Sequence, residues 1–425
     1  MPSLHIACIC DAGPSHVMAM GAIGRELIRR GHRVTVFQAH ELAQQISAEG
    51  LAFSPLPTRG FSVQHYVDLV VAQQGVSIRN FLDYSVKSAR MLCEEAPLAL
   101  QSAGVDGVVV DVSQPGGATA TETLGLPFVT LCNALPLHSD PAVPPDFLPW
   151  PYRDAAWARF RNRLGYTVRD LMISPLHRTL NRYRGAARLR PYRSPDDSFS
   201  PLAQITQLVP EFDLPRAHPA RVLHYVGPYR RESERDIPFP YDRLDGRPIV
   251  YASLGTVFGS RTPIWDAIVR GCAHLPVQLI VALGGNGRSP SVALPANAIV
   301  VDYAPQRELL SRASLSITHA GLNSVMEALA AQVPLIAIPI TGDQFGVAAR
   351  IAYTQTGETV PAAKCSARAI ACAARKILST PGYRERQAPI RAAIQSTRGA
   401  LTAAAIVEEA IATRQPLLRE SVLAS

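Results

Sequence analysis

Residues 316–330, SITHAGLNSVMEALA, join a run typical of the end of a strand to apolar residues at helical spacing. The turn between them is made of small residues, so backbone N–H groups can approach an anion, and the following helix adds the positive end of its dipole. The turn matches neither the Walker A pattern nor G-x-G-x-x-G. The stretch therefore predicts an α/β fold with a phosphate-binding turn, whose candidate ligands are His319, Gly321, Asn323 and Ser324.

Ser324 and Glu327 also allow a purely structural interpretation. Their Ser-x-x-Glu spacing is that of a capping box, in which both side chains only satisfy backbone N–H groups at the start of a helix. Taken alone, the spacing leaves both interpretations open.

Continuous apolar runs surround this stretch: PIVYASLG (248–255), VQLIVALGG (277–285), AIVVDYA (298–304) and PLIAIPI (334–340). Such runs are typical of parallel strands buried on both faces. Because ligands of parallel sheets bind beyond the carboxyl ends of the strands, residues at these ends are candidates for the same site. They are Ser253, Gly255, Thr256, Tyr303, Gln306, Asp343 and Gln344.

The first part of the chain shows the same alternation of strand-like and helical runs, beginning with LHIACIC (4–10) and RVTVFQ (33–38). Prolines and arginines interrupt it between 134 and 247. We therefore expect two Rossmann-like domains whose parallel sheets face each other across a cleft. The expected parts are an N-terminal domain (1–218), a linker (219–247), a C-terminal domain (248–400) and a final helix (401–425) that packs back toward the N-terminal domain.

The composition fits a folded protein of 425 residues, with 47% hydrophobic and 18% charged residues. No apolar run approaches the ~20 residues of a membrane span, and the first residues lack the basic region of an export signal, so we expect a cytoplasmic location. The seven cysteines show no metal-type spacing, and we expect them to be buried, reduced thiols.

Residues 302–344, DYAPQRELLSRASLSITHAGLNSVMEALAAQVPLIAIPITGDQ, resemble the nucleotide-sugar signature of UDP-sugar-dependent glycosyltransferases with the two-Rossmann GT-B fold. The resemblance implies that the C-terminal domain binds a UDP-sugar and the N-terminal domain binds the acceptor. Two positions depart from the family pattern. Tyr303 replaces the commoner Trp, which weakens stacking, and Ala320 stands where many bacterial members have Gly, which tightens the loop.

The same resemblance implies a role for each matched residue. Tyr303 stacks on uracil, and Gln306 lies near the base and the ribose. His319 and Ser324 hold the pyrophosphate, while Glu327 binds the ribose hydroxyls.

Asp343 and Gln344 match positions that bind hydroxyls of the transferred sugar. A leaving group that gains negative charge can be stabilised by a helix N-terminus and His319 without a metal. Since the sequence contains no Asp-x-Asp pair, we expect no metal and no cofactor beyond the co-substrate, UDP-glucose.

His16 follows the first predicted strand, at the position where the family has the base that deprotonates the acceptor hydroxyl. A carboxylate after a later strand orients that imidazole and stabilises its charged form. Asp111, which closes GVVVD, matches this position, and Asp106, before the same strand, is the weaker candidate. The structural alternative is that His16 and Asp111 are solvated loop residues.

Three further segments resemble the bacterial zeaxanthin glucosyltransferases: SARMLCEEAPLAL (88–100), GLPFVTLCNALPL (125–137) and FSPLAQITQLVPEFDLPR (199–216). This similarity implies an inverting transfer of glucose to the ring hydroxyls of a hydrophobic xanthophyll. Transfer to a macrolide or another small aglycone remains open, as do a nucleotide-sugar epimerase and a non-catalytic sugar-nucleotide sensor.

The net charge of +8 is concentrated in residues 153–193, where eleven arginines stand against Asp154 and Asp170. Aromatic and leucine residues lie among these arginines at helical spacing, a composition suited to peripheral contact with an anionic membrane. The alternative is a pair of helices whose apolar faces pack on the first domain. Without a recognisable nucleic-acid module, we expect no nucleic-acid partner.

Overall fold

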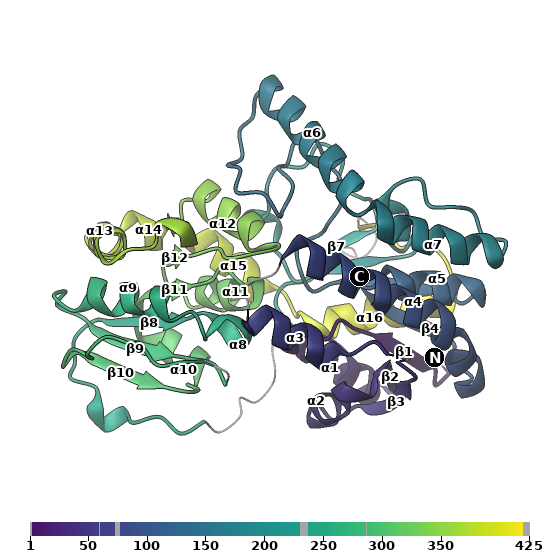
Figure 1. Cartoon of the computed structure of the whole chain (residues 1–425), viewed down its shortest axis with the longest axis horizontal. Coiled ribbons are helices and arrows are strands. Elements are labelled where there is room, and N and C mark those ends of the chain that lie inside the picture. The colour runs from purple at the N-terminus through teal and green to yellow at the C-terminus, as the bar shows by residue number, and fades with distance from the viewer. Residues whose placement is uncertain (1, 59, 73–76, 230–236, 286, 420–425) are drawn as a thin grey trace.

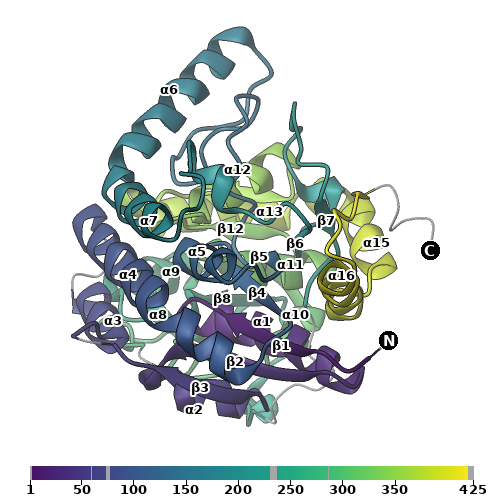
Figure 2. The ribbon, with the colours of Figure 1, turned by 90° about the vertical axis from the view of Figure 1, so that its right-hand side faces the viewer.

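The structure, a computed structural model, describes residues 2–58, 60–72, 77–229, 237–285 and 287–419. Within these residues the strands form two parallel sheets, each flanked by helices (Figures 1 and 2). The strand order is β3-β2-β1-β4-β5-β6-β7 in the first sheet and β10-β9-β8-β11-β12-β13 in the second. The expected pair of Rossmann-like domains with parallel sheets is confirmed.

The strands of the first sheet run through the N-terminal half of the chain: β1 (His5–Ile9), β2 (Arg33–Ala39), β3 (Ala52–Leu56), β4 (Gly107–Asp111), β5 (Phe128–Cys132), β6 (Gln204–Thr206) and β7 (Leu223–Tyr225). Those of the second sheet are β8 (Ile249–Ser253), β9 (Gln278–Ala282), β10 (Ala298–Val301), β11 (Ala313–Thr318), β12 (Leu335–Ala337) and β13 (Gly357–Thr359).

The first sheet is associated with α1 (Pro14–Arg29), α2 (Ala43–Ala48), α3 (Val63–Ala72), α4 (Ile78–Ala103), α5 (Pro115–Thr123), α6 (Ala156–Met172) and α7 (Ser174–Ala186). The second is associated with α8 (Gly255–Phe258), α9 (Thr262–Cys272), α10 (Gln306–Arg312), α11 (Leu322–Ala330), α12 (Gln344–Tyr353), α13 (Ala367–Leu378), α14 (Gly382–Glu385) and α15 (Ala388–Ser396). After these comes α16 (Ala400–Thr413).

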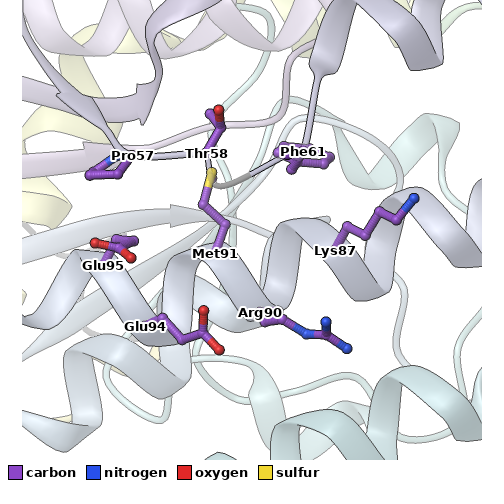
Figure 3. Close-up of a pocket in the computed structure, with 9 residues that line it drawn as sticks. Pro57, Thr58, Phe61, Lys87, Arg90, Met91, Glu94 and Glu95 are labelled. Atoms are coloured by element: carbon purple, nitrogen blue, oxygen red, sulfur yellow. The ribbon is translucent and has the colours of Figure 1, made fainter.

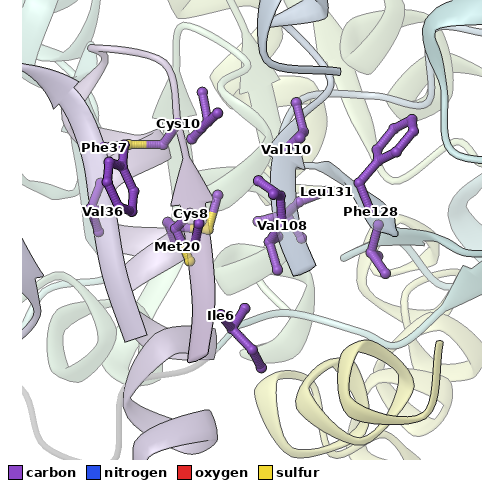
Figure 4. Close-up of a cluster of buried hydrophobic side chains, with 14 of the residues drawn as sticks. Ile6, Cys8, Cys10, Met20, Val36, Phe37, Val108, Val110, Phe128 and Leu131 are labelled. Atoms are coloured by element: carbon purple, nitrogen blue, oxygen red, sulfur yellow. The ribbon is translucent and has the colours of Figure 1, made fainter. Parts of the chain in front are cut away.

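The central strands are buried on both faces, which explains their continuous apolar sequences. Figure 4 shows part of the core of the first domain, where side chains of β1, β2, β4 and β5 meet those of α1. The labelled members of this cluster are Ile6, Cys8, Cys10, Met20, Val36, Phe37, Val108, Val110, Phe128 and Leu131. The cysteines are free thiols, but Cys93 and Cys365 are only half-buried and Cys372 is exposed, so the expectation of burial is wrong for these three.

The segment expected to be a linker, 219–247, begins with part of the first sheet. Its strand β7 pairs with β6, and residues 230–236 lie outside the described residues. The chain returns to the first domain at its end, where α16 lies against α1. Arg30, just after α1, donates to Glu408 of α16 with Nε at 2.8 Å.

Candidate active site

His16 and Asp111 come together at the carboxyl ends of two adjacent strands. Asp111 is the last residue of β4, while His16 lies in the first turn of α1, which follows β1. The His16 Nδ1 atom is 2.7 Å from Asp111 Oδ2, and the aspartate side chain is fully buried. The contact fixes the ring orientation and leaves Nε2 as the nitrogen that can accept a proton.

The pair has strongly shifted acid–base properties. Burial alone would lower the pKa of His16, but the charge and hydrogen bond of Asp111 overcome it and raise the pKa to about 9. Burial would likewise raise the pKa of Asp111, yet His16 and the hydrogen bonds from Ser113 hold it below its ordinary value. The ion pair is therefore stable in the absence of substrate.

Hydrogen bonds from neighbouring residues hold Asp111 and Asp11 in place beside His16. Ser113 donates to Asp111 Oδ1 through its N–H (3.0 Å) and its hydroxyl (2.7 Å). Asp11 accepts from Gln114 Nε2 at 2.7 Å, and its charge also raises the pKa of His16. Asp11 lies two residues after the end of β1, so the rule of strand ends could have found it.

Asp106, the weaker candidate for the orienting carboxylate, serves another purpose. Its Oδ2 accepts from the backbone N–H of His5 at 2.7 Å, at the amino end of the sheet. The structure therefore excludes Asp106 as the partner of His16.

The predicted phosphate turn in the second domain is compact around His319. A Cβ atom at Gly255 would lie 2.8 Å from the His319 ring, and one at Gly321 would lie 2.5 Å from it, so both positions require glycine. Burial lowers the pKa of His319 to about 4 despite the nearby backbone of Ser253, so the ring is neutral at pH 7. Its buried Nδ1 makes no hydrogen bond of normal geometry within the described residues.

Helix α11 begins at Leu322 with Gly321 as its N-cap, and no side-chain hydrogen bond caps it in the described part of the chain. Ser324 therefore lies inside the first turn, and the capping-box interpretation is wrong. Its neighbour in the turn, Ala320, has a φ of +66°. This left-handed conformation costs a non-glycine residue about 1–2 kcal/mol, which explains why glycine suits this position.

Glu327 contacts Gln306, another residue that the sequence predicts to bind the nucleotide-sugar. Gln306 Nε2 donates to Glu327 Oε2 at 2.6 Å, and Tyr251 donates to Gln306 Oε1 at 3.1 Å. Tyr303, by contrast, is 53% exposed, so a ring face is available for stacking. The four side chains lie on or next to β8, β10, α10 and α11.

Asp343 and Gln344 occupy the start of α12. Gln344 Oε1 accepts from the backbone N–H groups of Ile340 (2.8 Å) and Thr341 (3.1 Å), so its oxygen holds the preceding loop. Burial and the charge of Asp146 raise the pKa of Asp343 to about 6, while His16 lowers it. The carboxylate thus lies within electrostatic reach of His16 in the other domain.

A hydrogen bond joins the predicted phosphate turn of the second domain to the first domain. Gln207 Nε2, just beyond β6, donates to Asn323 Oδ1 at 2.5 Å and to the carbonyl of Asn133 at 3.0 Å. Asn323 was predicted from the sequence, whereas Gln207 and Asn133 were not, although both follow strands of the first sheet.

The two domains also share a buried ion network. The Arg350 side chain of α12 is fully buried and donates to Asp213 Oδ1 from Nη2 (2.7 Å) and Nε (3.0 Å). It reaches Asp146 at 3.3 Å, while Arg216 Nε donates to Asp213 Oδ2 at 3.0 Å. Burial would raise the pKa of Asp213, but the two arginines hold it well below its ordinary value.

Ser253 and Thr256 flank the Gly255 turn. The backbone N–H of Gly255 donates to Ser253 Oγ at 3.3 Å, and Thr256 is exposed. A cavity of about 320 Å³ lies elsewhere, between α4 and the segment after β3 (Figure 3). Its lining is Pro57, Thr58, Gly60, Phe61, Lys87, Arg90, Met91, Glu94 and Glu95, so no predicted site residue belongs to it.

Among the described residues, no three His, Cys, Asp or Glu side chains are grouped so that they could hold a metal ion. Metal independence stays a prediction. None of the helices in the described ranges combines the length and the hydropathy needed to cross a bilayer.

The two parallel sheets with their flanking helices form the GT-B glycosyltransferase fold, and two of the solved structures that share it illustrate the similarity. The glycotransferase of kitacinnamycin superposes with a TM-score of 0.74 at 21% identity, over 96% of this chain and 99% of the other. The calicheamicin glycosyltransferase CalG4 gives the same score and identity, over 98% and 100%.

The chain belongs to the UDP-glucoronosyl and UDP-glucosyl transferase family, whose pattern matches residues 8–391. It is thus a UDP-sugar glycosyltransferase of small-molecule acceptors. A zeaxanthin glucosyltransferase of Pantoea ananas is 34% identical over 424 residues, 98% of each chain. Another zeaxanthin glucosyltransferase, from Pseudescherichia vulneris, is 33% identical over 416 residues, 96% of this chain and 98% of that one.

Proposed function

We propose that the protein is an inverting glucosyltransferase that moves glucose from UDP-glucose to the ring hydroxyls of zeaxanthin or a related xanthophyll, in the biosynthesis of carotenoid glucosides. The observation that carries the reaction type is the 2.7 Å contact between His16 and Asp111 at the domain boundary. The acceptor class is supported by the similarity to two zeaxanthin glucosyltransferases over nearly the whole chain.

In the proposed reaction, His16 Nε2 takes the proton of the acceptor hydroxyl. The acceptor oxygen forms a bond to the anomeric carbon of glucose while the bond from that carbon to the UDP oxygen breaks. The electron pair of the broken bond stays on the β-phosphate oxygen, and Asp111 stabilises the imidazolium. Attack on the face opposite the leaving group inverts the anomeric configuration.

The donor is held by the second domain in this proposal. The pyrophosphate lies at the N-terminus of α11, where Ser324 and neutral His319 add donors to the helix dipole. Tyr303 stacks on uracil, Gln306 and Glu327 bind the ribose, and Asp343 and Gln344 bind the sugar. Ser253, Gly255 and Thr256 form the opposite wall of the phosphate turn.

The product assay tests the whole proposal. Purified protein is incubated with UDP-glucose and zeaxanthin in detergent, and products are identified by mass spectrometry. We expect mono- and diglucosides with β-linkages from the α-linked donor, and equal yield with EDTA. A macrolide aglycone and UDP-galactose serve as the competing acceptor and donor. Glycosylation of the macrolide alone would reject the carotenoid assignment, and inhibition by EDTA would reject metal independence.

The donor site predicts a clear effect of Ser324→Ala. Loss of a hydrogen bond to a charged phosphate weakens binding by ~1.5–3 kcal/mol, which is about 10- to 150-fold in the Kd for UDP. The melting temperature should not change, because Ser324 does not cap α11. Calorimetric titration and thermal melts measure the two quantities.

Ser366→Ala is the matched control for this substitution. Ser366 is a true N-cap, whose side chain accepts from the N–H of Ala369 at 3.2 Å. Its loss should cost ~1 kcal/mol of stability and leave UDP affinity unchanged. If Ser324→Ala behaves like Ser366→Ala, Ser324 has a structural role and no part in donor binding.

A further inference from the structure

Helix α6 projects from the body of the molecule (Figures 1 and 2). The face that it turns inward consists of small or polar residues. Asn162 Nδ2 donates to the carbonyl of Pro141 at 2.9 Å, and the Tyr166 hydroxyl donates to the carbonyl of Val143 at 3.2 Å. A Cβ at Gly165 would lie 2.7 Å from the Trp150 ring. The helix is thus held by polar contacts and close packing.

The apolar residues of α6 point to solvent. The exposed side chains are Trp157 (59%), Phe160 (63%), Leu164 (52%), Val168 (51%) and Leu171 (69%). At 3.6 residues per turn, their spacing of three and four residues places them in one stripe about 80° wide. An ordinary surface helix buries such a stripe, so the orientation of α6 is the reverse of the usual one. The alternative in which the apolar faces of two helices pack on the first domain is therefore wrong for α6, but it holds for α7, whose Leu176 and Leu180 pack against α4.

Positive charge is in excess on α6 and on the α7 segment that follows it. Of the eleven arginines in residues 153–193, Arg184 is buried against Glu122 and Arg169 pairs with Asp170. The exposed ones are Arg153, Arg159, Arg163, Arg178, Arg182, Arg188, Arg190 and Arg193. The carboxylates within the same residues are Asp154, which pairs with Arg159 at 2.9 Å, and the partly exposed Asp170.

We propose that the outer face of α6 docks on the surface of an anionic lipid bilayer. An exposed apolar stripe enters the boundary between headgroups and acyl chains, and arginines beside it attract anionic headgroups. The positive charge favours an anionic bilayer over a second copy of the chain, because the same arginines on two copies would repel each other across a dimer interface. The stripe is separate from the donor and catalytic residues, so docking goes beyond the proposed reaction. It would bring a membrane-dissolved acceptor to the enzyme.

Vesicle binding tests the proposal on the full chain. We expect co-sedimentation with phosphatidylglycerol vesicles, little with phosphatidylcholine vesicles, and release as salt rises, since the screening length falls from ~10 Å at 0.1 M to ~3 Å at 1 M. Exposed Trp157 reports the depth of insertion. Lipids with brominated acyl chains should quench its fluorescence, whereas the fully buried Trp265 should not respond. Trp157→Phe should remove the quenched signal.

Two sets of substitutions separate the contributions of the apolar stripe and of the arginines to vesicle binding. Phe160→Ser, Leu164→Ser and Leu171→Ser together should weaken vesicle binding more than tenfold. Arg159→Gln with Arg163→Gln should weaken it about thirtyfold at low salt, since each arginine near such a surface contributes about fivefold. Arg161 is left in place because its guanidinium lies over the Trp150 ring, at 4.8 Å, and donates to the carbonyl of Pro151 at 3.1 Å, so it ties α6 to the segment before it.

The matched controls lie on other surfaces. Leu98→Ser with Leu294→Ser alters exposed apolar residues, and Arg368→Gln with Arg375→Gln alters exposed charges of α13. All four substitutions should leave vesicle binding unchanged. Equal binding to neutral and anionic vesicles, or no loss in the triple variant, would overturn the proposal. The proposal would also be overturned if the protein did not bind vesicles but formed a dimer that the triple substitution dissociates, as measured by light scattering.

Discussion

His16→Ala should lower kcat by about 10²–10⁴, the usual contribution of a positioned general base. UDP affinity should stay the same, because the predicted donor residues belong to the other domain. Asp111 keeps its two hydrogen bonds from Ser113, so the fold should survive, and a thermal melt checks this. The control is His274→Ala, an exposed histidine of the second domain, which should keep full activity. Activity of His16→Ala within threefold of the wild type would remove the assigned mechanism.

The pH dependence of kcat/KM is an independent test of His16 as the base. With a pKa of about 9, only about one His16 in a hundred is neutral at pH 7 in the free enzyme, and the neutral form is the base. We therefore expect kcat/KM to rise about tenfold per pH unit above pH 7 and to level off near pH 9. Asp111→Asn removes the charge that raises this pKa, so the rise should move to lower pH while the plateau falls. A profile that does not move would show that Asp111 does not act through His16.

Arg350→Met should destabilise the protein by ~3–5 kcal/mol, because it leaves buried carboxylates without their partner across the domain boundary. Urea unfolding followed by fluorescence measures the shift. Adding Asp213→Asn restores charge balance in the cluster, so the double variant should lose less than the sum of the two single variants. Arg312→Met breaks an exposed pair with Glu308, 3.2 Å long, and should cost under ~1 kcal/mol. A similar small cost for Arg350→Met would mean that the network does not hold the domains together.

The fold was predictable where strands are long and buried. The continuous apolar runs that the sequence analysis assigned to strands are all strands, and helices follow most of them. The missed strands have physical reasons. β6, β7 and β13 each have only three residues, too few to show a period, and β3 contains Pro55 at the edge of its sheet.

The residues of the candidate site that lie at the carboxyl ends of strands were predictable from the sequence. Asp111 ends β4 and the turn at 319–324 follows β11 directly, so local sequence places them. Arg350 does not: in QFGVAARIAY it resembles a solvent-facing arginine, and only the docking of the two domains buries it. The orientation of α6 was equally hidden, because an amphipathic pattern predicts which residues share a face but not whether that face is covered.

The return of α16 to the first domain ties the folding of that domain to the order of synthesis. Ile406, Val407 and Ile411 of α16 and Leu417 beyond it belong to the same buried cluster as β1 and β4, and a Cβ at Gly107 would lie 2.6 Å from the Ile411 side chain. A ribosome makes β1 first and α16 last. The domain that begins the chain therefore completes its core only after the second domain has been translated, and its α16-facing apolar surface stays uncovered until then.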